Sequence, residues 1–178
     1  MANVILGLLL LGGPQTIYAL NKHFEAGVSL FYRASLGSLR SALTGLLERG
    51  EVTFTESVEN GRSKKAYEPT DAGRAAFFAW LTGPLTNADL ETQALSRLFF
   101  LGLLDSPAER HAVLDQITTR IEADEAELLG VAAHLDALEL PAEHAAVARY
   151  QRATLEYGLR SHRVGAELFA SLRDATAE

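Results

Sequence analysis

The sequence predicts a mainly α-helical chain: an N-terminal winged helix-turn-helix, made of helices plus a two-stranded wing, followed by an all-α second half. Three observations support this prediction. Three short helix-like segments precede two strand-like segments within the first 70 residues, the order typical of a winged helix-turn-helix. A heptad pattern of apolar residues runs from Leu114 to Leu138. The last segment carries apolar side chains on two faces, which favours a second packing partner.

Two short helices are predicted before residue 30. Residues 2–11 are almost wholly apolar and end at Gly12-Gly13-Pro14, where the proline cannot continue a helix. Residues 15–25 repeat apolar side chains at three- and four-residue steps, which predicts the second helix. The apolar run from Val4 to Leu11 is too short for a membrane span, which needs roughly 20 residues, and no basic residue precedes it as in a signal peptide. We therefore expect a buried helix and no membrane partner.

A third helix is predicted over about residues 35–49, with one apolar and one polar face. Its leucines recur at three- and four-residue steps. Gly50 is suited to end it, because the left-handed conformation common at helix C-termini costs glycine little. The opposite face carries small hydroxyl side chains and one cation: Ser35, Ser38, Arg40, Ser41 and Thr44.

A two-stranded hairpin is predicted after the third helix. Val52 and Phe54 alternate with threonines, which is the period of a half-buried strand. Asn60-Gly61 is typical of a hairpin tip. Three cations follow the tip: Arg62, Lys64 and Lys65. A helix with a polar face beside a basic wing indicates a surface for duplex DNA.

The remainder of the chain is predicted to be helical. Thr70 can cap a helix over about residues 71–81, and Gly83-Pro84 ends it. Residues 85–92 then indicate a linker, and residues 93–104 are too apolar for an isolated surface helix. The expected domains are residues 1–84, a winged helix-turn-helix domain that binds DNA, and residues 85–178, a helical domain for dimerisation and possible effector binding.

The second half also predicts self-association. The heptad that begins at Leu114 continues for roughly four repeats as a coiled-coil-like seam, and Pro141 separates it from a last helix over about residues 142–175. Gly158 and Gly165 would permit a close helix crossing. An intramolecular bundle is the simpler alternative, but the two apolar stripes of the last helix favour a homodimer. The expected interface comprises Leu114, Ile121, Leu128, Leu135, Tyr150, Tyr157, Val164 and Leu168.

The net charge of −7 is unevenly distributed. Residues 1–80 carry eight Lys/Arg and seven Asp/Glu, a net charge of +1, whereas residues 81–178 carry eight against sixteen, a net charge of −8. Because local charge governs phosphate binding, the acidic second half does not exclude DNA binding by the first. The weak positive balance leaves one rival open, a helical interaction module whose winged domain binds protein rather than DNA.

DNA contact is predicted for ten residues. Hydroxyls at the start of the third helix can hold phosphates, and Arg40 can reach a guanine edge or a phosphate. The wing cations suit phosphate or minor-groove contact, and two side chains of the second helix can reach a phosphate. For each residue taken alone, the alternative to DNA contact is a solvated polar face or a charged turn. Their joint placement on a helix-turn-helix and its wing favours DNA contact. The ten are Tyr18, Lys22, Ser35, Ser38, Arg40, Ser41, Thr44, Arg62, Lys64 and Lys65.

Several motifs occur together in the first half: Ile5-Leu-Gly-Leu-Leu9, Gly13-Pro14 with Tyr18-Ala-Leu20, Ser35-Leu-Gly-Ser-Leu39, Ala42-Leu43, Leu47-Glu-Arg-Gly50, and Gly61-Arg62 through Tyr67-Glu-Pro-Thr-Asp-Ala-Gly-Arg74. Over about residues 4–82 the chain thereby resembles PadR-type transcriptional regulators. The second half is similar only in kind, as a helical extension. The resemblance implies a dimeric repressor, released from DNA by a small, often aromatic or cationic, ligand. A dimer in turn predicts a roughly palindromic operator.

Two positions depart from the pattern of this family. Members usually carry a tyrosine where this chain has Arg40, and a glycine where it has Ile17. Arg40 can add a base or phosphate contact, so the operator sequence cannot be taken from relatives. Ile17 predicts a different packing of the second helix.

Aromatic residues near the junction of the two halves are candidates for an effector pocket, because ligand sites are often apolar clefts at such junctions. They are Trp80, Phe99, Phe100 and Tyr150, and plain core packing is the alternative for each. Catalysis is not expected. The five histidines lack metal-ligand spacing, and the chain has no Gly-x-Ser-x-Gly elbow, no phosphate-binding glycine loop and no cysteine. No cofactor or metal is predicted, and the lack of cysteine fits a cytoplasmic protein.

Overall fold

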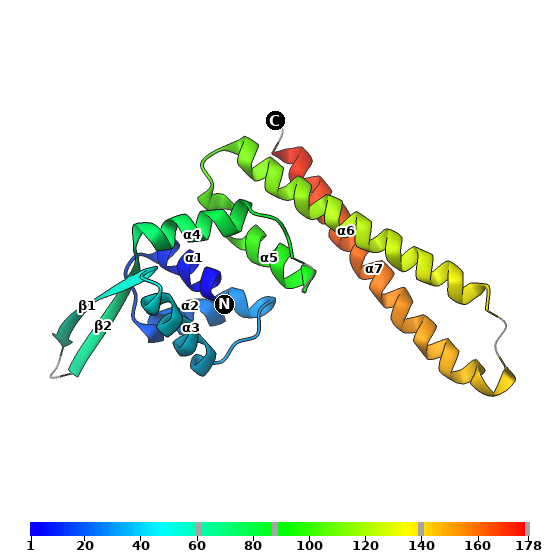
Figure 1. Ribbon diagram of the computed structural model, residues 1–178, viewed down its shortest axis with the longest axis horizontal. Helices are drawn as coiled ribbons and strands as arrows, with labels where there is room; N and C mark the ends of the chain where they lie inside the picture. The colour runs from blue at the N-terminus through cyan, green and yellow to red at the C-terminus, as the bar shows by residue number, and fades with distance from the viewer. Residues whose placement is uncertain (60–61, 87–88, 139–140, 177–178) are drawn as a thin grey trace. The chain divides into compact units, whose positions relative to one another are not determined.

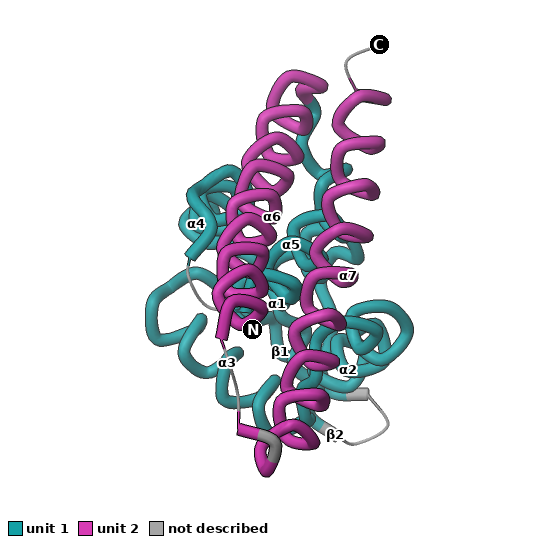
Figure 2. Tube along the Cα trace, turned by 90° about the vertical axis from the view of Figure 1, so that its right-hand side faces the viewer, with its two compact units in different colours: residues 1–105 teal, residues 106–178 magenta. Residues whose placement is uncertain are grey.

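The computed structural model describes residues 1–59, 62–86, 89–138 and 141–176. Its contacts divide the chain into two compact units, residues 1–105 and residues 106–178, which Figure 2 colours separately. Helices dominate and are accompanied by a two-stranded sheet, which confirms the predicted mainly α fold. The functional boundary at residue 84 stays a prediction. None of the helices within the described ranges combines the length and hydrophobicity that crossing a membrane requires.

Unit 1 consists of short helices and a β-hairpin wing, as Figure 1 shows. Its elements have the predicted order and type, with boundaries within a few residues of those expected. They are α1 (Ala2–Gly12), α2 (Ile17–Ala26), the 3₁₀ turn η1 (Val28–Leu30), α3 (Leu36–Glu48), β1 (Val52–Glu59), β2 (Arg62–Pro69), α4 (Asp71–Thr82), α5 (Leu90–Phe100) and the 3₁₀ turn η2 (Leu101–Leu103).

Helix α1 forms the centre of the core of unit 1. Ile5, Leu6 and Leu9 are fully buried, and α1 packs against α2, α3, α4 and β2. Gly7 brings α1 against the ring of Phe100, because a Cβ atom there would lie 2.6 Å from that ring. The first apolar segment is therefore a buried helix, as predicted.

Helix α2 begins two residues later than predicted, because Gln15 extends the wing instead. The amide of Gln15 donates to the carbonyl of Tyr67 at 2.9 Å, and the amide of Tyr67 donates back at 2.8 Å. The Gln15 side chain is buried and donates to the carbonyl of Leu8 at 2.8 Å. Thr16 then caps α2 by accepting the amide of Ala19 at 3.2 Å. The loop before α2 is thus tied to both the wing and α1.

The wing is an antiparallel hairpin that is anchored at its base. Its strands pair from Val52 with Pro69 to Glu59 with Arg62, and the predicted tip, Asn60-Gly61, lies outside the described residues. At the base, Gly50 has the left-handed φ of 68° expected for a helix end.

Helix α5 begins inside the segment that we predicted to be a linker. Asp89 caps it by accepting the amide of Thr92 at 3.1 Å, so residues 90–92 are helical. The helix ends at Phe100 rather than at residue 104, and a 3₁₀ turn follows. Phe100 is buried and packs edge-on against Phe77 of α4, with ring centroids 5.6 Å apart.

Unit 2 is an antiparallel hairpin of two long helices, α6 (Pro107–Asp136) and α7 (Ala145–Ala175), joined through the 3₁₀ turn η3 (Ala142–His144) (Figures 1 and 2). The two glycines of α7 lie in its seam. A Cβ atom on Gly158 would lie 3.5 Å from Leu128, and one on Gly165 would lie 3.5 Å from Ile121. The close crossing predicted at these glycines therefore occurs within one chain.

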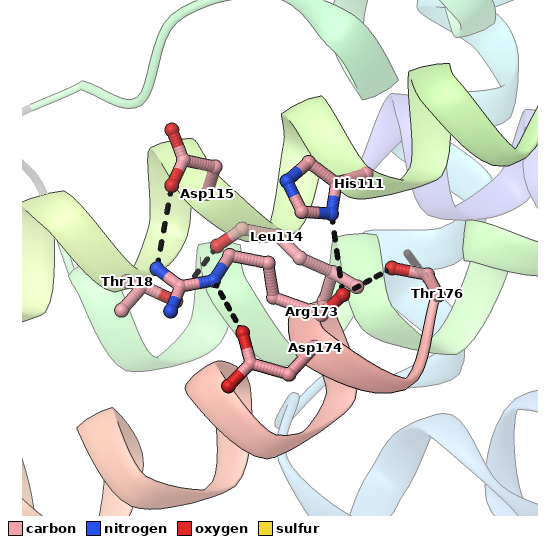
Figure 3. A network of polar contacts seen from close by, with 7 residues as sticks. All are labelled: His111, Leu114, Asp115, Thr118, Arg173, Asp174 and Thr176. Atoms are coloured by element: carbon pink, nitrogen blue, oxygen red, sulfur yellow. Dashed lines mark hydrogen bonds and ion pairs between the residues drawn. The ribbon is translucent and has the colours of Figure 1, made fainter. Parts of the chain in front are cut away.

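Ion pairs across the hairpin fix its register. Asp115 pairs with Arg173 at 3.4 Å, Glu125 with Arg163 at 3.6 Å, and Asp136 with Arg152. Successive pairs are ten and then eleven residues apart on both helices. Figure 3 shows the first of them in a network, in which the carbonyl of Arg173 accepts from His111 at 3.2 Å and from Thr176 at 2.7 Å. Each exposed pair contributes little energy, but together they disfavour a shifted pairing.

Candidate nucleic-acid interface

The polar face of α3 is exposed along its whole length. Ser35, Ser38, Arg40, Ser41 and Thr44 all point to solvent, while Leu39, Leu43 and Leu46 are buried on the other side. The predicted division of this helix into two faces is confirmed.

The first two serines of this face also start the helix. Ser35 accepts the amide of Ser38 at 3.1 Å, and Ser38 accepts the amide of Ser35 at 2.9 Å, which forms a capping box. The box leaves the positive end of the helix dipole directed towards solvent, where it favours an anion such as a phosphate.

Arg40 is the cation at the middle of this face. Among the described residues its side chain has no hydrogen-bond or ion-pair partner, although its carbonyl accepts from the hydroxyl of Thr44 at 3.1 Å. A guanidinium held on a helix face without an internal partner is available for a base edge or a phosphate.

A groove of about 380 Å³ lies between α2, α3 and β2. It brings together five of the ten predicted contact residues, namely Tyr18, Arg40, Thr44, Lys64 and Lys65. Lys22, Ser35, Ser38 and Ser41 are exposed outside its lining. The side chain of Arg62 lies outside the described residues. The groove thus joins α2, α3 and the wing into a surface with three cations, Arg40, Lys64 and Lys65.

Three polar residues of the groove were not predicted: Thr16, Ser63 and Tyr67. Ser63 is next to the wing lysines, and the alternation of β2 places Tyr67 two residues after Lys65 on the same strand face. The period-2 pattern of this strand could have identified Ser63 and Tyr67 as groove residues. For Thr16 the sequence offered no such pattern, only its position before a helix.

The wing holds Lys65 in place through an aromatic contact. Its ammonium lies 4.1 Å from the centre of the Phe54 ring, and Phe54 packs on Tyr67 with ring centroids 5.7 Å apart. Such a cation–π contact stabilises one position of a long side chain. On the same strand, Ser63 donates to the carboxylate of Glu56. The contact therefore favours one position of the Lys65 side chain beside the groove.

The aromatic residues predicted for an effector site lie in different surroundings. Trp80 lines a second cavity of unit 1, of about 730 Å³. Phe100 is core. Phe99 is 40% exposed and packs against Phe31, with ring centroids 5.8 Å apart. Tyr150 belongs to unit 2 and is exposed on α7.

The residues predicted for the dimer interface separate into two groups. Ile121 and Leu128 face α7 of their own chain, and Leu114 is also buried. By contrast, the second stripe of α7 is uncovered, with exposed fractions of 71%, 75%, 65% and 45% for Tyr150, Tyr157, Val164 and Leu168. Leu135 is half-buried. The stripe on α7 is thus the part of the predicted interface that stays exposed within its own chain.

The helices, wing and exposed polar face define unit 1 as a winged helix-turn-helix. Residues 5–79 match the model of the transcriptional regulator PadR-like family. This match covers the winged-helix segment and agrees with the resemblance that the sequence motifs indicated. No curated protein matches the chain at a significant level.

Solved structures resemble the chain over most of its length. PadR of Bacillus subtilis in complex with operator DNA shares 21% identity, with 98% of this chain and 96% of that one covered and a TM-score of 0.45. The protein smu.1604c of Streptococcus mutans UA159 shares 20%, with 96% of both chains covered and a TM-score of 0.45. PadR of Bacillus subtilis in complex with p-coumaric acid shares 22%, with 99% and 95% covered and a TM-score of 0.43.

Proposed function

We propose that the chain is a ligand-responsive transcriptional repressor that binds a palindromic operator as a homodimer. The observation that carries this proposal is the groove between α2, α3 and β2, where Arg40, Lys64 and Lys65 line one surface. The family match of residues 5–79 supports regulation of transcription as the purpose of that surface.

In this proposal α3 enters the major groove and the wing contacts the flanking backbone. Arg40 reads a base edge or a phosphate, since its side chain has no internal partner among the residues that the structure describes. Lys64 and Lys65 neutralise phosphates, which positions the domain without reading sequence. Tyr18 and Thr44 flank the same groove and contact the backbone.

The homodimer forms through the uncovered stripe of α7. Tyr150, Tyr157 and Val164 recur at seven-residue steps, and Leu168 continues the same face. Exposed apolar side chains at this spacing favour helix pairing with a second copy. Two copies present two α3 helices, which suits half-sites about one helical turn, ~34 Å, apart.

The effector binds in the 730 Å³ cavity at Trp80. The cavity is also lined by Phe31, Tyr32 and Arg33, which lie two to four residues before the first residue of the α3 capping box, Ser35. A ligand that displaces these three residues changes the start of α3 and thereby the affinity for DNA.

A gel shift with the promoter region of the protein's own gene tests the proposal, with an unrelated duplex of the same length as competitor. We expect a discrete complex that the unrelated duplex does not displace and that weakens steeply with salt, because counterions are released on binding. Equal competition by both duplexes would refute sequence-specific binding. The absence of any complex, together with capture of a protein by the winged domain, would favour the interaction-module alternative.

A further inference from the structure

One carboxylate lies on the same face of the wing as Lys65. The register of the hairpin places Glu56 of β1 directly opposite Lys65 of β2. Phe54 belongs to the next pair on this face towards the base of the wing, and Ser63 belongs to the next pair towards the tip. Lys65 and Ser63 line the groove between α2, α3 and β2, so Glu56 lies beside the surface proposed for DNA.

Glu56 and Lys65 carry opposite charges but turn away from each other. Opposite charges in this relation stabilise a hairpin when they pair, yet no ion pair joins these two in the described strands of the wing. The ammonium of Lys65 lies 4.1 Å from the centre of the Phe54 ring, one pair nearer the base. The carboxylate of Glu56 accepts from the hydroxyl of Ser63, one pair nearer the tip. The cation therefore leans towards the base and the anion towards the tip.

The carboxylate of Glu56 is held in position and still accessible. Glu56, Ser63 and Lys65 are all exposed, so a molecule that approaches this face of the wing can reach them. An ionised carboxylate has about four lone-pair sites on its two oxygens, and the single hydroxyl hydrogen of Ser63 occupies one of them. Glu56 is therefore an oriented acceptor with sites left for a second donor.

A carboxylate beside a lysine that binds phosphate is unfavourable on DNA unless the DNA offers it a donor. Successive pairs on one strand face are about 7 Å apart. With Lys65 on a backbone phosphate, the carboxylate of Glu56 is directed past that phosphate, towards the tip and the adjoining minor groove. The base edges in that groove offer one donor, the N2 amino group of guanine, whereas A·T pairs present only acceptors there.

We propose that Glu56 is a specificity-determining residue of the wing, which accepts a hydrogen bond from the N2 amino group of a guanine in the minor groove beside each half-site. A hydrogen bond to an ionised acceptor is stronger than one between neutral groups. An A·T pair at the same place offers no donor, and the negative potential of a narrow A·T-rich minor groove repels a carboxylate. Attraction and repulsion thus select the same base pair. The inference rests on the proposed function, since it requires the wing to contact operator DNA.

Replacement of guanine by inosine tests this contact. Inosine lacks the N2 amino group but keeps O6 and N7, the major-groove acceptors available to Arg40. We would titrate the full chain, by fluorescence anisotropy, against two labelled duplexes of the promoter region of its own gene, one with guanine and one with inosine at every guanine position. We expect the parent protein to bind the guanine duplex at least about tenfold more tightly, the scale of one hydrogen bond to a charged group.

Two variants separate the acceptor from its charge. Glu56→Ala removes both and should bind the two duplexes with nearly equal affinity. Glu68→Ala is the matched control, because it removes the same charge from the wing but on the opposite face, where Glu68 pairs with Thr53. The control should keep the preference of the parent for guanine. Since Glu56 is exposed, Glu56→Ala should also keep the melting temperature of the parent.

The titrations distinguish failure of this inference from failure of the proposed function. A parent protein that binds both duplexes equally would overturn the role of Glu56 and leave operator binding intact. The same holds for a Glu56→Ala protein that keeps the guanine preference, and for a Glu68→Ala protein that loses it, since the effect would then follow the charge of the wing alone. The absence of a complex with either duplex would refute the proposed function, and the role of Glu56 with it.

Discussion

Gly73 of α4 lies directly against the backbone carbonyl of Glu51 at the start of the wing. A Cβ atom at position 73 would overlap that oxygen. The same carbonyl accepts the amide of Thr70 at 3.1 Å, and the hydroxyl of Thr70 donates to Gly50 at 2.6 Å and accepts from the amide of Gly73 at 3.2 Å. The run Thr70-x-x-Gly73 is therefore the joint that attaches α4 to the base of the wing.

Gly73→Ala should destabilise unit 1 by about 1–3 kcal/mol, because a fixed backbone oxygen cannot yield to the added methyl as a side chain would. Thermal unfolding measures this as a fall of roughly 4–8 °C per kcal/mol for a unit of this size. Gly37→Ala is the matched control, since the nearest atom to its Cβ is 3.6 Å away. The control should be neutral or stabilising by up to about 1 kcal/mol. Equal melting temperatures for the two variants would contradict this account of the joint.

The features that sequence predicted well depend on neighbours within about one helical turn. The leucine spacing of α3 predicted which face of that helix is buried. Gly50, which is left-handed, predicted where the helix ends, and Thr70 predicted where α4 begins. Each is a local rule, in which a side chain meets its own backbone or the next turn. The wing followed from period-2 alternation in the same way.

Two of the features that sequence missed, the pairing of Gln15 and the burial of Arg97, depend on distant partners. Gln15 pairs with Tyr67, which no local pattern predicts, so the start of α2 was placed too early. Asp89 starts α5 inside the expected linker, because its cap is a single side chain without periodicity. Arg97 stands in a run that we interpreted only as too apolar for an isolated surface helix. Its burial was not predicted, because the surroundings of its side chain exist only once distant segments meet.

Arg40→Ala should lower operator affinity by ~1–3 kcal/mol if Arg40 reads a base, because a lost bidentate contact leaves the base edge unpaired. Anisotropy titrations against the operator and against single-base variants of it measure both affinity and specificity. A base contact predicts relaxed discrimination at one position of each half-site. Arg74→Ala, which removes an exposed cation of α4 outside the groove, should leave affinity unchanged. Identical titrations for the two variants would remove Arg40 from the interface.

The double substitution Lys64→Ala and Lys65→Ala should weaken binding to all duplexes alike. Each neutralised phosphate contributes about 0.9 to the slope of log affinity against log salt, so the slope should become shallower by about 2. Lys64→Arg with Lys65→Arg keeps both charges and should keep the parent slope. A slope that stays unchanged in the alanine variant would place the wing away from the DNA backbone.

The dimer proposed for α7 places Val164 near the middle of an apolar stripe, so a charge there would be buried without a partner in the dimer. Val164→Glu should therefore give a monomer by light scattering of the full chain at micromolar concentration. Because Val164 is 65% exposed within its own chain, the variant should keep the melting temperature of the monomer's fold. Ala145→Glu adds the same charge at an exposed position of α7 on another face of the helix and should remain dimeric. Loss of the dimer should also cost operator affinity, since two linked half-site contacts bind far more tightly than one. A Val164→Glu protein that stays dimeric and binds the operator normally would show that the second copy pairs through another face.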